Sequence, residues 1–266
     1  DIGWKCAVSN LSDIAAMGGV PDYALVTLGV PPGASVKTYA DFYDGMNAAF
    51  AEFGGAIVGG DVVSCPTMFV NIALTGHPST DSLGEPTTMR RTEAQPGDLV
   101  CVTGPLGSSA GGFEALLRGD PNPSSDILIE RHYQPSPRIE VGSKLVASGV
   151  RCAMDVSDGL VADLQKIAKS SRVNITIEMK NIPLATELIS MFGSGAIELA
   201  LSGGEDYELV FTASKPLVDN LVANKIGLTV IGSVDSSESL GGQVKIIDVN
   251  GDLYEPVRKG WDHLNV

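Results

Sequence analysis

Ala153-Met154-Asp155-Val156-Ser157-Asp158-Gly159-Leu160 places two carboxylates three residues apart, with a serine between them and a glycine after them. Residues 151–154 have the pattern of a short strand, and apolar residues recur at helical spacing from Leu160 onward. The stretch therefore predicts a strand-to-helix turn. Ser157 or Asp158 is a candidate N-cap of the helix, because either side chain can accept a hydrogen bond from a free N–H of the first turn.

The same turn carries two carboxylates. A helix N-terminus favours a bound anion, yet Asp155 and Asp158 would repel a phosphate. A divalent cation between the carboxylates and the phosphate reconciles these tendencies, and Mg²⁺ is usually held by one or two carboxylates plus substrate phosphates. The alternative is a capped turn with solvated aspartates, and this octapeptide alone leaves both interpretations open.

Composition excludes several classes of protein. The chain has 266 residues, of which 44% are hydrophobic, and this predicts one large domain or two ordinary ones. No apolar run approaches the roughly 18 residues of a membrane span, and residues 1–5 do not form a signal peptide. A net charge of −14 argues against a nucleic-acid-coating protein. Phosphate ligands remain compatible with this charge when metal ions screen it.

Cysteine and histidine usage points to a reducing compartment and away from zinc. The 4 cysteines contain no CxxC pair, so we expect buried thiols in a cytoplasmic protein. The 3 histidines contain no HxxxH pair, so zinc catalysis is not expected.

Two further stretches place small residues beside a carboxylate. Residues 2–17 have helical apolar spacing, and Asp13 lies there among small side chains. Asp13 either binds a cation or lies on the solvent-exposed face of the helix, and the sequence leaves both interpretations open. Residues 56–58 predict a strand that ends at Gly59-Gly60-Asp61, where the glycines permit a close ligand approach. We expect Asp61 to bind a ligand, because it repeats the acidic turn at Asp155.

Other segments predict the remaining architecture. Residues 67–76 predict a strand antiparallel to its predecessor, and residues 104–112 form a glycine-rich strand–helix junction that resembles a weak phosphate cradle. The connector 78–98 contains an arginine pair suited to phosphate or to a surface salt bridge. We place the domain boundary in this connector, giving domains 1–84 and 85–266. The alternation of helices and short strands predicts two α+β domains rather than a Rossmann fold or a barrel.

Asp13, Asp61, Asp155 and Asp158 thus lie on separate elements, and the sequence reveals no nucleophile–histidine pair beside them. This combination favours metal-templated phosphoryl transfer over covalent or acid–base chemistry, because positioning and charge neutralisation supply most of that catalysis.

Five motifs occur in order along essentially the whole chain, namely NLSDIAAMG at 10–18, VGGD at 58–61, DVSDGL at 155–160, LSGGEDYEL at 201–209 and GWDH at 260–263. Together they resemble the thiamine-monophosphate kinase family of the aminoimidazole ribonucleotide synthetase-like superfamily. The resemblance implies two α+β domains and a homodimer formed through the N-terminal domains. It also implies direct in-line transfer of the ATP γ-phosphate to thiamine monophosphate, giving thiamine diphosphate, with several Mg²⁺ ions.

The resemblance also assigns residues to roles. The residues that match metal ligands are Asp13, Asp61, Asp155 and Asp158. The residues that match ATP contacts are Tyr43, Gly60, Asp61, Arg91 and Ser157. Glu205 and Trp261 match contacts to the thiamine phosphate, with Trp261 as the stacking aromatic ring.

One departure and two alternatives accompany the resemblance. Chains of this family begin several dozen residues earlier, with a Gly-Asp-Asp-Ala segment that supplies further metal ligands, so we expect this sequence to be truncated. One alternative is another enzyme of the superfamily, such as the ligase or the hydrogenase maturation dehydratase. The dehydratase would carry a C-terminal Cys, whereas this chain ends at Val266. The other alternative is a non-catalytic nucleotide-binding module.

Overall fold

The computed structural model describes residues 1–119, 122–236, 242–258 and 260. Trp261 therefore lies outside the described residues. The helices are α1 (Ile2–Ala16), α2 (Val36–Phe53), α3 (Ser108–Arg118), α4 (Pro123–Tyr133), α5 (Ile139–Ser148), α6 (Leu160–Ser171), α7 (Thr186–Phe192), α8 (Ala196–Ser202) and α9 (Lys215–Ala223). The strands are β1 (Gly19–Val30), β2 (Ala56–Ser64), β3 (Phe69–Thr80), β4 (Pro86–Thr87), β5 (Leu99–Val102), β6 (Cys152–Asp155), β7 (Val173–Glu178), β8 (Leu209–Ala213), β9 (Thr229–Ser236), β10 (Val244–Ile247) and β11 (Leu253–Tyr254).

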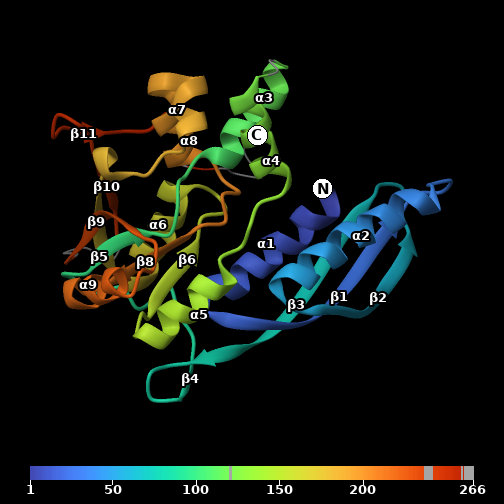
Figure 1. Cartoon of the computed structure of the whole chain (residues 1–266), viewed down its shortest axis with the longest axis horizontal. Coiled ribbons are helices and arrows are strands. Elements are labelled where there is room, and N and C mark those ends of the chain that lie inside the picture. The colour runs from blue at the N-terminus through green and yellow to red at the C-terminus, as the bar shows by residue number, and fades with distance from the viewer. Residues whose placement is uncertain (120–121, 237–241, 259, 261–266) are drawn as a thin grey trace.

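The described strands form two mixed sheets. The first is a 4-stranded sheet in the order β2-β1-β3-β4, and the second is a 7-stranded sheet in the order β11-β10-β7-β9-β5-β8-β6. Figure 1 shows the first sheet as an arm beside the larger body that contains the second sheet. The expected α+β architecture is confirmed. None of the helices in the described part of the chain combines the length and the apolarity needed to cross a membrane.

The first sheet confirms one expectation and corrects another. β3 runs antiparallel to β2, as expected, and both strands pair with β1, which lies between them. β2 continues to Ser64, so Asp61 lies within the strand and not at its end. The physical reason is the close approach of β1, because a Cβ on Gly60 would lie 1.8 Å from the carbonyl oxygen of Val26. Gly60 adopts φ +152° and lets the strand pass this point.

Helices α1 and α2 cover one face of the first sheet (Figure 1). Their apolar stripes pack into a core with β1 that contains Leu11, Val26, Met46 and Phe50, all of them buried. The opposite face of the same sheet keeps apolar side chains exposed, and Leu25 and Phe69 on neighbouring strands are 52% and 42% exposed. The sheet is therefore covered on one face only within this chain.

Helix α1 connects the two sheets. Its first half packs against α2, and its last turn joins a second core in which Ala15 and Ala16 contact residues of the 7-stranded sheet and of α5. Helix α5 approaches so closely that a Cβ on Gly142 would lie 2.2 Å from the carbonyl oxygen of Ala15. This contact fixes the position of α1 between the two parts of the molecule.

We predict that Gly142→Ala lowers the free energy of unfolding by about 1–3 kcal/mol, because α5 must move away from the α1 backbone. An alanine in an unconstrained helix would instead raise stability. Denaturant unfolding measures the change. The matched control is Gly227→Ala, where an added Cβ meets nothing within 4 Å. A Gly142 variant as stable as this control would show that the close approach is not a constraint.

Candidate active site

The DVSDG turn joins β6 to α6, as the sequence predicts. Asp155 is 3% exposed, and its Oδ2 accepts a hydrogen bond from Ser12 Oγ of α1 at 2.8 Å. The pKa of Asp155 is raised to about 6, mainly by burial. The Ser12 hydrogen bond opposes this rise, and the negative charge of Asp13 adds to it. The turn therefore places one strongly desolvated carboxylate at the contact between α1 and the larger sheet.

The N-cap expectation for Ser157 or Asp158 is wrong. The N-cap is Gly159, and the free amides of residues 157, 158 and 159 donate to Asp163 Oδ2 at 3.0, 3.0 and 3.2 Å. Asp163 also accepts from Lys166 Nζ at 2.7 Å, and the same ammonium contacts Asp158 Oδ2 at 2.6 Å. Sequence reasoning missed Asp163, although an acidic residue in the first turn of a helix is a recognisable signal.

The SGGEDYEL segment packs its backbone directly onto this turn. Glu205 N donates to the Ser157 carbonyl at 2.9 Å, and Tyr207 N donates to the Val156 carbonyl at 3.1 Å. Glu205 and Tyr207 adopt φ values of +64° and +53°, which residues other than glycine rarely adopt. A Cβ on Gly204 would lie 2.2 Å from the Ser157 carbonyl oxygen. Such backbone strain tends to occur at functional sites.

Asp206 occupies the place where residues 104–112 predicted a phosphate cradle. Gly107 N and Ser109 N, at the start of α3, donate to the Asp206 carboxylate at 2.6 and 3.1 Å. Desolvation raises the pKa of Asp206 to about 7, and these amides lower it. The cradle expectation is wrong for these two amides, because a carboxylate from the same chain already binds them.

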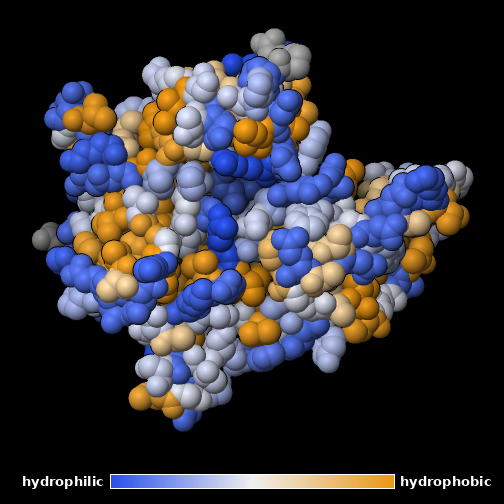
Figure 2. Space-filling model, in the orientation of Figure 1, coloured by the Kyte–Doolittle hydropathy of each residue, from blue (hydrophilic) through white to orange (hydrophobic). Residues whose placement is uncertain are grey.

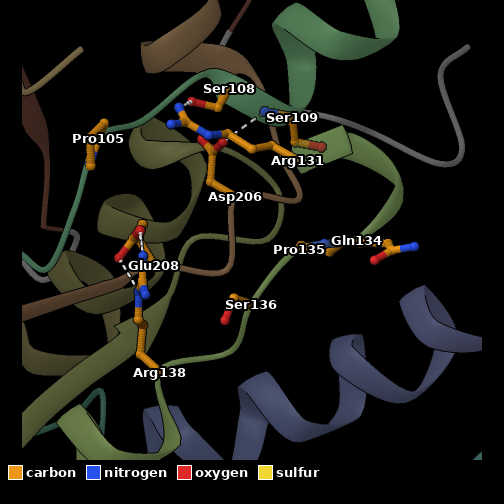
Figure 3. A pocket seen from close by; sticks show the side chains of 10 residues that line it. All are labelled: Pro105, Ser108, Ser109, Arg131, Gln134, Pro135, Ser136, Arg138, Asp206 and Glu208. Atoms are coloured by element: carbon orange, nitrogen blue, oxygen red, sulfur yellow. Dashed lines mark hydrogen bonds and ion pairs between the residues drawn. The ribbon is translucent and has the colours of Figure 1, made fainter. Parts of the chain in front are cut away.

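Glu208 closes the adjacent cavity, which has a volume of about 230 Å³ (Figure 3). Its carboxylate is buried and accepts hydrogen bonds from both Nε and Nη2 of Arg138, with the Nε bond at 2.8 Å. Thr103 Oγ1 adds a third hydrogen bond at 2.6 Å. Figure 3 also shows Arg131 reaching across the cavity to Ser108. This cavity is lined by charges that are already paired.

A second cavity of about 350 Å³ lies beside the N-terminal half of α1. Its lining includes Lys5, Ser9, His132, Glu205 and Tyr207. The structure also reveals a serine–histidine pair that the sequence did not, with Ser109 Oγ 2.9 Å from His132 Nδ1. Figure 2 shows hydrophilic side chains gathered in the hollow where the two parts of the molecule meet.

The structure brings together some of the sequence-predicted site residues. Asp13 is exposed on α1; desolvation raises the pKa of its carboxyl and the nearby charge of Lys166 lowers it. Asp13, Asp155 and Asp158 therefore share one electrostatic neighbourhood. Gly260, at the end of the described chain, also reaches this turn, since its Cβ would lie 2.8 Å from the Asp158 carbonyl oxygen.

Three other predicted residues lie on elements away from this turn. Asp61 is exposed on β2 and accepts from Val62 N at 2.8 Å. Tyr43 on α2 packs edge-on against Phe42. Arg91 is exposed, and its carbonyl accepts from Ser171 Oγ at 2.9 Å. Within the described residues, these three side chains make no hydrogen bond or ion pair with Asp155.

The carboxylates described at this turn do not form a ready-made metal cluster. Within the described ranges, no three His, Cys, Asp or Glu side chains lie together in a group that could hold a metal ion. Asp13 and Asp155 nonetheless fit Mg²⁺ by donor chemistry, because each supplies hard oxygens and the charge of Asp13 raises the pKa of Asp155. Asp158 is instead paired with Lys166.

The architecture and the site define a class of protein. Residues 1–77 match the family model described as AIR synthase related protein, N-terminal domain, and residues 95–245 match the corresponding C-terminal domain. The chain belongs to this family of two-part α+β proteins. A hydrogenase maturation protein HypE in complex with ATP also has this fold, with a TM-score of 0.80 at 21% identity over 100% of this chain and 81% of that one.

Closer similarities narrow the class. Thiamine-monophosphate kinase from Aquifex aeolicus is 35% identical over 98% of this chain and 80% of its own length. The Bacillus subtilis thiamine-monophosphate kinase is 37% identical over 88% of this chain and 73% of its own length. The structure of AaThiL complexed with AMPPCP and TMP superposes with a TM-score of 0.85 at 34% identity, over 98% and 80% of the two chains. The chain is a member of the thiamine-monophosphate kinase family.

We predict that Asp163→Asn lowers the free energy of unfolding by about 1–3 kcal/mol, because a charged carboxylate no longer accepts hydrogen bonds from three backbone amides. Denaturant unfolding and circular dichroism measure the change. Asp219→Asn, which breaks an exposed pair with Lys215, is the control and changes stability little. Equal stability of the two variants would contradict the role of Asp163 as the organiser of this turn.

Proposed function

We propose that this chain transfers the γ-phosphate of ATP to thiamine monophosphate and forms thiamine diphosphate. The observation that carries this proposal is the 2.9 Å hydrogen bond from Glu205 N to the Ser157 carbonyl. It joins the turn assigned to metal and ATP directly to the loop assigned to the acceptor. Membership of the thiamine-monophosphate kinase family supports the same assignment.

Residue roles follow from this proposal. Mg²⁺, when bound, screens the negative charge that phosphates and carboxylates share. Its proposed ligands are Asp13, Asp155 and Asp158 together with Asp61. The proposed ATP contacts are Tyr43, Gly60, Asp61, Arg91 and Ser157, and the proposed acceptor contacts are Glu205 and Trp261.

The reaction is direct transfer from ATP to the acceptor. The Ser109–His132 pair is the arrangement nearest to an activated nucleophile among the described residues, and its geometry is unsuitable. Glu205 Oε2 lies 3.9 Å from the same Nδ1 atom that contacts Ser109. In a catalytic triad the carboxylate and the hydroxyl contact opposite ring nitrogens. We therefore assign no covalent phospho-enzyme to this site.

Incubation with Mg²⁺, ATP and thiamine monophosphate tests the function through chromatographic detection of thiamine diphosphate and ADP. We predict that Asp155→Asn and Asp61→Asn each lower turnover at least about a thousandfold, since loss of a metal ligand removes several kcal/mol of charge stabilisation. Asp219→Asn should keep wild-type turnover. Near-wild-type activity in either site variant would remove that residue from the metal site, and no product from the wild-type protein would refute the function.

We also propose the domain limits 1–84 and 85–266 and a cytoplasmic location. The family models end and begin on either side of this boundary, at residues 77 and 95. β4 lies just after it and pairs with β3, so the first sheet reaches slightly beyond. The four cysteines are free, which is consistent with a reducing compartment.

The open face of the first sheet supports a homodimer. Exposed apolar side chains there, such as Leu25 and Phe69, form a surface of the kind that a second copy covers. We predict that Leu25→Asp converts the dimer to a monomer, because the new charge would be buried unpaired. Light scattering measures the mass. The control is Val36→Asp on α2, where the side chain is 85% exposed. A Leu25→Asp variant that stays dimeric, or a monomeric wild type, would contradict this interface.

A further inference from the structure

Side chains of α1 and α4 converge on the carboxylate of Glu205, and a serine of α3 supports them. Lys5 Nζ from α1 donates to Glu205 Oε2 at 2.7 Å and lies 3.2 Å from Nδ1 of His132 on α4. The same Nδ1 contacts Ser109 Oγ of α3 at 2.9 Å. The side chains of Lys5 and His132 are 19% and 14% exposed, whereas Glu205 is 46% exposed. The two inner residues therefore support the carboxylate from behind.

The charges of this group identify Lys5 as the supporting cation. Burial lowers the pKa of His132, the charge of Lys5 lowers it, and Glu205 raises it. The net lowering keeps the imidazole neutral at pH 7, so Lys5 supplies the positive charge that faces Glu205. A charge-assisted hydrogen bond of this kind fixes the orientation of a carboxylate more strongly than a neutral one.

Helix α1 sets the direction in which an acceptor lies. Lys5, Ser9 and Ser12 follow one another at helical spacing along one side of α1. Lys5 and Ser9 line the 350 Å³ cavity, and Ser12 binds Asp155. The seven residue steps from Lys5 to Ser12 span about 10 Å of helix. The Asp155 end suits the reacting phosphates, so the cavity at the Lys5 end is left for the organic part of the acceptor.

Tyr207 connects the two ends of this path. It lines the cavity and is 4% exposed. Its backbone N–H donates to the Val156 carbonyl of the acidic turn at 3.1 Å. The same residue therefore contacts both the cavity and the turn.

We propose that Lys5 is a positioning residue for the acceptor. It holds Glu205 Oε2 against the cavity wall and leaves Oε1 directed to the nitrogen-rich, cationic rings of thiamine monophosphate. This inference rests on the proposed function, because it takes Glu205 as the acceptor contact. Lys5 acts through Glu205 and does not touch the transferred phosphate.

The test compares Lys5→Met, Lys5→Arg, Glu205→Gln and the double variant Lys5→Met/Glu205→Gln. Calorimetry measures binding of thiamine monophosphate without nucleotide, and kinetics measures KM for each substrate. We expect Lys5→Met and Glu205→Gln each to weaken acceptor binding about tenfold, with the KM for ATP unchanged. The double variant should be little worse than either single variant, because both changes remove one unit. Lys5→Arg should recover most of the loss, since arginine also donates to a carboxylate.

Lys37→Met is the matched control, because it breaks an exposed ion pair with Asp41 near the start of α2. It should leave both KM values and the melting temperature unchanged. Unaltered acceptor affinity in Lys5→Met, or additive effects in the double variant, would overturn the inference. Equal shifts of both KM values with a lower melting temperature would also overturn it, as a merely structural effect. Calorimetry needs no turnover, so a wild type that binds the acceptor without forming product refutes the kinase proposal and still tests Lys5.

Discussion

The hydrogen bond between Ser12 on α1 and Asp155 on β6 holds the acidic turn against α1. An ionisable carboxyl that is 3% exposed is costly to bury without a partner, and the hydroxyl on α1 supplies one at 2.8 Å. The bond joins α1, which covers the first sheet, to β6, an edge strand of the second sheet. Its position fixes the register of α1, so that Lys5 reaches the cavity and Ala15 lies against Gly142.

The segment from Glu205 to Glu208 distributes four consecutive residues over four tasks. Glu205 lines the large cavity, Asp206 binds the first amides of α3, Tyr207 enters the core of the first sheet, and Glu208 pairs with Arg138. A regular strand sends its side chains to two faces only. Left-handed conformations at Glu205 and Tyr207 break that alternation, and backbone hydrogen bonds to the DVSDG turn offset the strain. The strained backbone is thus the means by which one short segment serves several parts of the site.

The sequence predicted what local patterns determine. The helices α1 and α2 and the strand β5 follow from apolar periodicity, which needs no knowledge of distant residues. The continuation of β2 through Gly60 was not predictable, because its cause is the backbone of Val26 on another strand. The capping of α3 by Asp206 and the Ser109–His132 pair likewise depend on contacts between separate segments. Local chemistry located the acidic turns, while their partners came from tertiary structure.

The buried carboxylates also explain why a cation would select Asp155. Within the described chain the buried acidic residues are Asp155, Asp163 and Glu208. Asp163 accepts from three amides and Lys166, and Glu208 accepts from Arg138 and Thr103, so their acceptor capacity is largely used. Asp155 has one hydroxyl donor from a side chain, and a carboxylate offers about four lone-pair sites. Its raised pKa near 6 reflects that shortfall in stabilisation of the charged form. A hard cation next to Asp13 and Asp155 would supply it, at the place where the phosphates of both substrates are proposed to meet.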